Sequence, residues 1–429
     1  MVISLVLAGG WFGTRELQAR ERSRITAKHR LSPIEQLRQR DVQISVWEKA
    51  LAMDPTSALA LGNLAAFHLQ RARESGEYAD YAKAESLARR SLGSRTQRNG
   101  PAFVTLASAL LAQHDFGHAR AIAQDVTQLY PDTPEYRALL AETQLELGDY
   151  ADAARAFEGL SASRSGLSIA PRLARWEEIR GQSDRARAIL AAALKSAQTQ
   201  DLPAEQLSWF YLRLGDVEMR SGRTRSARKT LEAGLEATPD DYRLLGALAR
   251  LEAGEGNTAR AIDFGERSLA QRLDPLTLGT LSDIYAARGD SAKSAEYMAA
   301  LEATAAGQPG PFHRALSLFL LDRNTRVAEV LVKAEEEIKT RKDIYGYDLL
   351  GWALYKSHRY VEARAAMRMA RRMSTEDAQI YYHTGMVERA LGKTAAASDY
   401  LERALTINPG FNYAQAKIAR ATLESLGGG

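Results

Sequence analysis

The spacing of two histidines gives this sequence its single metal-like pattern. His114 and His118 are four residues apart, and an i, i+4 pair on one helix could ligate zinc. The stretch HDFGH, however, falls at a turn between two expected helices, and no third ligand pattern accompanies it. We therefore interpret both histidines as solvated turn residues and expect no bound metal.

Other patterns that would indicate catalysis are missing from the sequence. It contains no cysteine, which excludes disulfides, thiolate metal sites and cysteine nucleophiles. We find no phosphate-binding glycine loop, no nucleophile elbow and no motif of paired carboxylates. We therefore expect no catalytic residues and no cofactor, although catalytic groups drawn from distant parts of a sequence would leave no such motif.

The elements that would position a functional side chain repeat with a period of about 34 residues. In each unit a helix-period apolar pattern runs for about 14 residues, breaks at a glycine or polar turn, and resumes for a similar length. The stretch LLAETQLELGDYADAARAF contains Leu140 and Ala141, then Gly148, then Ala153. Small residues let antiparallel helices approach closely, and a glycine ends the first helix. The pattern predicts closely packed helix pairs.

These recurring positions resemble the tetratricopeptide repeat family over about residues 58–409. The unit near residue 140 is completed by Tyr150, Ala153, Phe157 and Leu160, and the last unit by Gly385, Gly392, Ala397, Leu401, Ala404 and Pro409. The unit near Pro309 departs from the pattern, because Ala315 and Leu316 are in reversed order and the turn glycine is absent. The resemblance implies an all-α fold, a right-handed superhelical solenoid of about ten antiparallel helix pairs.

The expected organisation follows from this array. It comprises an apolar segment (1–13), a basic arm (14–42), an N-terminal repeat array (43–302), a Gly/Pro-rich bend (303–311), a C-terminal array (312–409), and a capping helix with a glycine tail (410–429). Each unit is expected to bury its apolar stripe only against its neighbours, so that stability is nearly one-dimensional. Since repeats take up almost the whole chain, we expect no separate catalytic domain and no enzyme activity.

The N-terminal segment MVISLVLAGGWFG is apolar. As a helix it would span about 20 Å, short of the roughly 30 Å hydrocarbon core of a membrane. It resembles the apolar part of a signal peptide but lacks the positive residues that normally precede it. It is either the end of a signal peptide or anchor, a short helix that docks on the fold, or a disordered end. We favour an extracytoplasmic or membrane-associated location over a cytoplasmic one.

The net charge of +4 is concentrated near the N-terminus. Residues 14–45 contain eight basic and four acidic residues, so the remainder of the chain is close to neutral. A nucleic-acid-binding protein should show a basic face across its folded body. We therefore expect no nucleic-acid partner and interpret the basic segment as a solvated or membrane-proximal arm.

In the tetratricopeptide repeat family the first helix of each unit lines the concave face. Carrying these positions over gives an acidic patch of Glu135, Glu142 and Glu146, a mixed stretch of Arg175, Glu178, Asp216 and Arg220, and a basic stretch of Arg243 and Arg250. The last two full units contribute Tyr345, Trp352, Tyr355, Lys356, Tyr382 and Arg389. Rings and cations of this kind suit a peptide. The alternative is that these rings fill the space between helices.

The sequence therefore predicts a non-catalytic scaffold that binds an extended peptide or a partner helix in its concave groove. It would be an assembly factor or complex subunit at a membrane or outside the cytoplasm. One alternative is a structural subunit that uses its convex face and ends, and another is a regulatory subunit of an enzyme. Solvent-open rings between residues 345 and 389 would favour the binder, and buried rings the structural subunit. The sequence does not indicate the oligomeric state.

Overall fold

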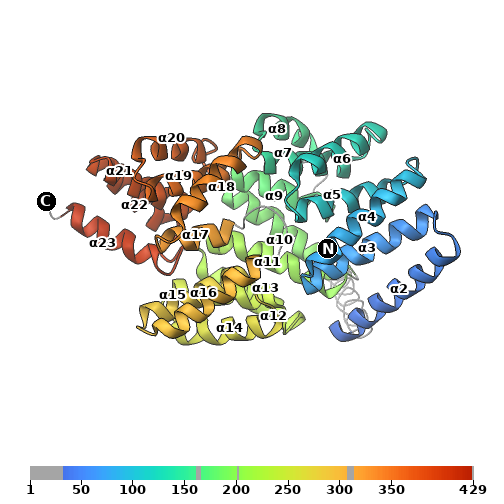
Figure 1. The fold of residues 1–429 in the computed structure, drawn as a ribbon, viewed down its shortest axis with the longest axis horizontal. Coiled ribbons are helices and arrows are strands. Elements are labelled where there is room, and N and C mark those ends of the chain that lie inside the picture. The colour runs from blue at the N-terminus through green and yellow to red at the C-terminus, as the bar shows by residue number, and fades with distance from the viewer. Residues whose placement is uncertain (1–31, 161–165, 201, 307–313, 428–429) are drawn as a thin grey trace, which may run out of the picture.

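The computed structural model describes residues 32–160, 166–200, 202–306 and 314–427, and these ranges contain 22 helices and no strand. The predicted all-α solenoid is confirmed. Figure 1 shows the helices winding from α2 (Pro33–Met53), blue, to α23 (Gln415–Gly427), red, with the two at opposite sides of the view. Short connections make successive helices antiparallel neighbours.

Ten helix pairs lie between α2 and α23 in the described part of the chain. They are α3 (Ala58–Ser75) with α4 (Tyr78–Ser94), α5 (Gly100–Ala112) with α6 (Phe116–Leu129), α7 (Pro134–Leu147) with α8 (Tyr150–Phe157), α9 (Ala170–Ile179) with α10 (Ser183–Thr199), α11 (Ala204–Arg220) with α12 (Thr224–Ala237), α13 (Tyr242–Gly254) with α14 (Thr258–Gln271), α15 (Pro275–Ala287) with α16 (Ser291–Ala306), α17 (Arg314–Asp322) with α18 (Val327–Thr340), α19 (Ile344–Lys356) with α20 (Tyr360–Ala370), and α21 (Ala378–Ala390) with α22 (Thr394–Ile407).

The turns inside the pairs need a left-handed backbone. Gly148 has φ +80° at the end of α7, a conformation that costs glycine nothing. Three pairs without a turn glycine use other residues there, namely His114 (φ +61°), Asn324 (φ +55°) and His358 (φ +61°). His114 is therefore a turn residue, as predicted, whereas His118 lies in the first turn of α6. No group of three or more potential metal ligands occurs among the residues that the structure describes.

Small residues mark the helix crossings, as the repeat pattern predicts. Ala153 and Ala397 have no exposed surface. A Cβ atom added to Gly385 would lie 2.7 Å from Leu401 Cγ, closer than packed atoms approach. The first and second helices of the last pair therefore meet at a distance that only glycine allows at this position.

Successive turns of the superhelix touch along a line of contacts that we call the seam. The seam joins the C-terminal ends of α3, α7, α9 and α11 to connections that lie 189 to 196 residues further along the chain. Backbone oxygens accept its hydrogen bonds: Gly76 O from Arg272 Nη2 (2.7 Å), Leu147 O from Lys342 N (3.0 Å), Ile179 O from Thr375 Oγ1, and Met219 O from Asn408 Nδ2 (2.8 Å). Because the last carbonyls of a helix lack partners within it, the next superhelical turn supplies the missing donors.

The seam corrects the expectation that each unit contacts only its sequence neighbours. In Figure 1 the orange α18 lies beside the green α7 and α8, although about half of the chain separates them. Near Gly254 the two turns approach so closely that an added Cβ atom would lie 2.3 Å from the backbone oxygen of Gly410. The superhelix is therefore wound tightly enough for one turn to support the next.

The described residues cover only part of the predicted domain organisation. The apolar segment 1–13 lies outside the described residues, as do most of the basic arm and residues 307–311 of the expected bend. The final residues of the arm belong to α2, which Ser32 caps through the backbone N–H of Glu35. None of the described helices is both long enough and apolar enough to cross a membrane.

Candidate functional site

The inside of the superhelix holds a charged cavity of about 780 Å³. First helices of the pairs from α7 to α19 form most of its wall. Its charged lining comprises Glu142, Glu146, Arg175, Arg213, Asp216, Arg220, Arg250, Asp283, Arg314, Asp322, Arg341 and Asp377, and its aromatic lining comprises His114, Trp209, Phe319, Tyr345, Phe411 and Tyr413. Arg314, Arg341 and Tyr345 belong to the second superhelical turn, so the cavity exists only where the two turns meet.

A second cavity of about 900 Å³ is more apolar and lies toward the N-terminal units. Its apolar lining comprises Leu69, Tyr81, Val104, Leu111, Phe116, Leu167, Leu202, Trp209 and Phe210. Five residues line both cavities: His114, Glu142, Glu146, Trp209 and Arg341. The two cavities therefore adjoin one another, and we call them together the channel, with a charged section and an apolar section.

Glu178 organises the arginines of the charged section. Its carboxylate lies 2.9 Å from Arg175 Nη1, 2.6 Å from Arg220 Nε and 3.9 Å from Arg213 Nη2. Burial acts to raise the pKa of Glu178, but the guanidinium groups of Arg220, Arg175 and Arg213 outweigh it and hold the pKa at about 2. Glu178 is thus ionised at neutral pH and fixes the arginine side chains in the wall.

Burial has the opposite result for two other carboxyls of the channel. It raises the pKa of Asp283 to about 6; the nearby Arg323 opposes this shift, and Asp322 adds to it. It also raises the pKa of Glu146, although Arg175 and Arg341 act against it. The firmly ionised Glu178, which contacts arginines of the lining but does not itself line either cavity, thus differs from two lining carboxyls that hold a proton more readily than usual.

The predicted acidic patch is not a free acidic surface. Glu142 lies 2.6 Å from Arg172 Nε, and Glu146 lies 3.4 Å from Arg341 Nη2. Both line the channel, whereas Glu135 is exposed in the first turn of α7. The patch therefore consists of two compensated carboxylates inside the channel and one glutamate on the surface.

The two arginines of the predicted basic stretch have different environments. Arg243 lies 2.6 Å from Asp241 and 3.1 Å from Glu205, so it ties the start of α13 to α11. Arg250 lines the charged section, and its nearest carboxylate oxygen, on Asp216, is 3.9 Å away. Arg250 is therefore available to the channel, and Arg243 serves the packing of the wall.

The aromatic cluster differs most from the expectation of open rings. Trp352 and Tyr382 are each only 2% exposed and belong to the hydrophobic core. Tyr355 stacks on Trp352 with the ring centroids 4.7 Å apart. These rings fill the space between helices, which was the alternative interpretation of the sequence.

The other three predicted residues of this group lie apart from one another. Tyr345 lines the channel between Arg175 and Arg314, whose guanidinium carbons lie 5.0 Å and 5.2 Å from the ring centroid. Lys356 lies over the Trp352 ring and donates to Asn324 Oδ1 at 3.0 Å, and Arg389 is exposed. Of the cluster, Tyr345 is thus the residue that the structure places in the channel.

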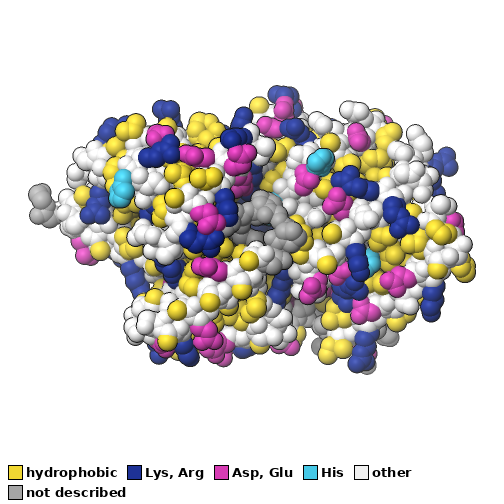
Figure 2. All heavy atoms as spheres, in the orientation of Figure 1, with side chains coloured by type: hydrophobic (Ala, Val, Ile, Leu, Met, Phe, Trp, Pro, Cys, Tyr) yellow, Lys and Arg dark blue, Asp and Glu magenta, His cyan; other side chains and the backbone are white. Residues whose placement is uncertain are grey.

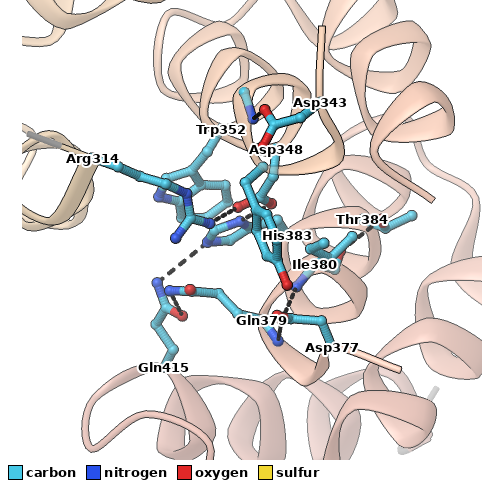
Figure 3. A network of polar contacts seen from close by, with 12 residues as sticks. Arg314, Asp343, Asp348, Trp352, Asp377, Gln379, Ile380, His383, Thr384 and Gln415 are labelled. Atoms are coloured by element: carbon cyan, nitrogen blue, oxygen red, sulfur yellow. Dashed lines mark hydrogen bonds and ion pairs between the residues drawn. The ribbon is translucent and has the colours of Figure 1, made fainter. Parts of the chain in front are cut away.

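Figure 3 shows the polar network around Trp352, Asp348 and His383. Its indole stacks on His383, with ring centroids 4.1 Å apart, and donates to Asp322 Oδ1 at 2.9 Å. His383 Nδ1 lies 2.7 Å from Asp348 Oδ1, and Asp348 Oδ2 lies 2.5 Å from Arg314 Nη2. Asp348 and His383 have no exposed surface. The pair therefore holds Arg314 in place and is out of reach of a ligand.

The sequence analysis missed several residues of the channel. Trp209, Arg213 and Phe210 lie on α11, the first helix from which the sequence analysis took only Asp216 and Arg220 as groove residues. Arg314 and Arg341 enter the channel from the second superhelical turn. A turn-by-turn count of first-helix positions could have found Arg213, which precedes Asp216 by one helical turn. No signal in the sequence indicates that the second turn closes on the first.

The surface offers a different pattern of charge. Figure 2 shows acidic and basic side chains interspersed over the face drawn, without a continuous basic region on it. The arginines of the channel, by contrast, are gathered in the lining of its charged section.

Comparison with known proteins identifies the repeat. A tetratricopeptide repeat model matches residues 212–275 and 349–410, and a model of subunit 3 of the anaphase-promoting complex, cyclosome, matches residues 77–160. No curated protein matches the chain. The family predicted from the sequence is confirmed: the chain is a tetratricopeptide repeat protein.

Several solved structures are similar to this chain. They include the APC/C hetero-tetramer Cut9–Hcn1 (14% identity, 91% of this chain and 93% of that chain, TM-score 0.34), the human IFIT1 dimer with PPP-AAAA (15% identity, 85% and 94%, TM-score 0.44) and yeast Tom70 (10% identity, 96% and 96%, TM-score 0.35). At these identities and TM-scores the likeness carries no argument about function.

Proposed function

We propose that this tetratricopeptide repeat protein is a non-catalytic scaffold that binds an extended segment of a partner protein inside its channel. The repeat fold supports a role in protein–protein interaction in general. The observation that supports the channel as the site is that an apolar section and a charged section adjoin, with Trp209 lining both. Each section has the volume of a typical ligand pocket.

The lining suits an extended segment better than a helix. Ser108, Ser168 and Gln206 line the apolar section among its aliphatic side chains. An extended chain presents unpaired N–H and C=O groups that such side chains can bond, whereas a helix satisfies its own backbone groups. Large apolar side chains of the segment would bury their surface against Leu111, Trp209 and their neighbours.

A peptide-display selection on the purified protein tests this proposal. We expect enriched peptides to carry large apolar residues and to bind Trp209→Ala about tenfold more weakly or worse, because a tryptophan in a partly buried site contributes a large share of binding energy. Val361→Ala is the matched control, since Val361 is 75% exposed on the outer helix α20. Peptides that bind wild type and Trp209→Ala equally well would count against the channel as the site.

The expected location remains a prediction. It depends on residues 1–13, which lie outside the described ranges, and the described helices add no support for a membrane span.

A structural subunit that joins an assembly by its ends is a second candidate. The N-terminal helix α2 exposes Ile34, Val42, Val46 and Met53, between 49% and 87% of each side chain, and the burial of Trp352 and Tyr382 also favours this role. Sedimentation velocity on wild type and on Val42→Glu/Val46→Glu would test whether α2 mediates self-association. A wild-type oligomer that the variant loses would favour end-to-end assembly over channel binding.

A further inference from the structure

We propose that the N-terminal segment of this chain (residues 1–13) occupies the apolar section of the channel and is displaced when a partner segment binds. The position of the N-terminal segment does not depend on the proposed function, whereas its displacement rests on that function. The N-terminal segment lies outside the described residues. The helix α2 that follows it and the apolar section are both described.

The helix α2 begins at the rim of the apolar section. Gln36, in the first turn of α2, accepts a hydrogen bond from the backbone N–H of Ala204 at 2.7 Å. Ala204 lies between Leu202 and Gln206, and both of these residues line the apolar section. The start of α2 is therefore fixed beside the wall of this cavity.

A second contact fixes the course of α2. Arg40 pairs with Glu74, and both side chains are only 9% exposed. Glu74 directly follows Arg73, which lines the apolar section. Because both contacts hold α2 beside the cavity, the chain that precedes Pro33 starts from the rim of the apolar section.

The chain between the N-terminal segment and α2 is long enough to bring the segment into the cavity. Residues 14–32 separate the two. At about 3.3–3.6 Å per residue this stretch spans up to about 65 Å when fully extended. A tether of this length holds the segment at an effective concentration on the order of millimolar. A modest intrinsic affinity is therefore enough to fill the apolar section.

The composition of the N-terminal segment matches the lining of the apolar section. Residues 1–13 contain no charged side chain and are rich in large apolar ones, among them Trp11 and Phe12. Contact with the leucines and aromatic rings of the lining removes this apolar surface from water, which is the main favourable term in association. Ser108 and Gln206 also line the section and can bond the backbone N–H and C=O groups of an extended chain.

The exposed apolar face of α2 is a poorer site for the same segment. Ile34, Val42, Val46 and Met53 lie on one side of a single helix, which covers only one side of a docked chain. A cavity encloses most of its ligand. A membrane is also a poorer environment, because thirteen residues are too few to cross the hydrocarbon core as a helix. The apolar section is thus the described surface that best shields the segment from water.

Cross-linking in the full chain tests the position of the N-terminal segment. The chain contains no cysteine, so benzophenone maleimide can be attached at Ala8→Cys alone, and mass spectrometry can locate the products. We expect cross-links to the residues of α3, α5 and α11 that line the apolar section, within one chain. Cross-links to the exposed face of α2, or between chains in a mixture of isotopically light and heavy protein, would overturn the proposal.

The accessibility of the wall provides a second readout. Ser108→Cys places one thiol in the lining, and its rate of reaction with a maleimide measures access to the apolar section. We expect Leu5→Asp/Leu7→Asp to raise this rate about tenfold, because carboxylates are costly to bury among apolar side chains. The matched control is Ala19→Asp/Ala27→Asp, which adds the same charge outside residues 1–13.

Equal reaction rates with and without Leu5→Asp/Leu7→Asp, or equal acceleration by the control, would overturn the proposal. Circular dichroism checks that each variant is folded. If Ser108→Cys is unfolded, Ser168→Cys, which also lines the apolar section, replaces it in the same comparison.

Competition with a peptide separates this inference from the proposed function. A display-selected peptide that requires Trp209 should bind Leu5→Asp/Leu7→Asp about tenfold more tightly than wild type, because the tethered competitor has been removed. Equal affinities would overturn the displacement and leave the proposed function standing. If no selected peptide requires Trp209 but the cross-links fall in the apolar section, the proposed function is refuted and the position of the N-terminal segment is supported.

Discussion

The seam can be tested with glycines that share a backbone conformation but differ in what surrounds them. Gly148 has φ +80° and Gly256 has φ +82°. A Cβ atom on Gly148 would lie 2.3 Å from Lys342 O and 2.6 Å from Asp343 N across the seam, whereas a Cβ atom on Gly256 would meet nothing within 4 Å. Replacing each by alanine therefore imposes the same backbone strain, but only Gly148→Ala forces the two superhelical turns apart.

The expected magnitudes follow from this difference. An alanine in the left-handed region costs roughly 1–2 kcal/mol, which is the whole cost expected for Gly256→Ala. Gly148→Ala also disturbs the hydrogen bonds from Lys342 N to Leu147 O and from Ile344 N to the Tyr150 hydroxyl, at 3.0 Å and 2.8 Å. At about 1 kcal/mol for each hydrogen bond, the loss of both lowers the unfolding free energy of Gly148→Ala by about 2 kcal/mol more than backbone strain alone.

Urea unfolding followed by circular dichroism measures the two free energies, and amide hydrogen exchange locates the damage. Gly148→Ala should reduce protection in both α7 and α19, which lie on successive turns, whereas Gly256→Ala should affect only the pair α13–α14. Equal free-energy losses, or exchange changes confined to the α7–α8 pair, would show that the seam contributes nothing to stability and would refute this reasoning.

Three further substitutions have defined outcomes. Glu178→Gln should lower the unfolding free energy by about 3 kcal/mol at pH 7. The pKa of Glu178 in the folded protein is about 2, below the ordinary 4.5. The difference in unfolding free energy between wild type and variant should therefore be complete above pH 4.5 and shrink as the pH falls toward 2. Gly385→Leu should lower the melting temperature through overpacking against Leu401, at roughly 1–3 kcal/mol; an unchanged melting temperature would contradict the register. Trp352→Ala should cost about 3–5 kcal/mol in urea unfolding, whereas a ring open to the groove would cost little.

The helix pairs could be predicted because their determinants are local. Each pair depends on residues within one repeat, such as Ala153 at the crossing and Gly148 at the turn, and these types recur in phase. The pair α17–α18 lacks a turn glycine, and Asn324 adopts the left-handed conformation there instead. The same reasoning failed for Trp352, because first-helix position alone does not say whether a ring meets solvent. Here His383 and Asp322 come from other helices and cover it.

The channel could not be predicted because it depends on how many units complete one superhelical turn. The number of units in one superhelical turn is the sum of small rotations between neighbouring units, and no single residue determines it. Once one turn takes between 189 and 196 residues, Arg314, Arg341 and Tyr345 face α7, α9 and α11 across the interior. The seam then has a second consequence. It joins the two turns by hydrogen bonds, so the lining side chains of α7, α9 and α11 keep their positions relative to Arg314, Arg341 and Tyr345 without a bound partner. Preorganisation of this kind reduces the entropy lost on binding, and it links the stability of the seam to the affinity of the channel.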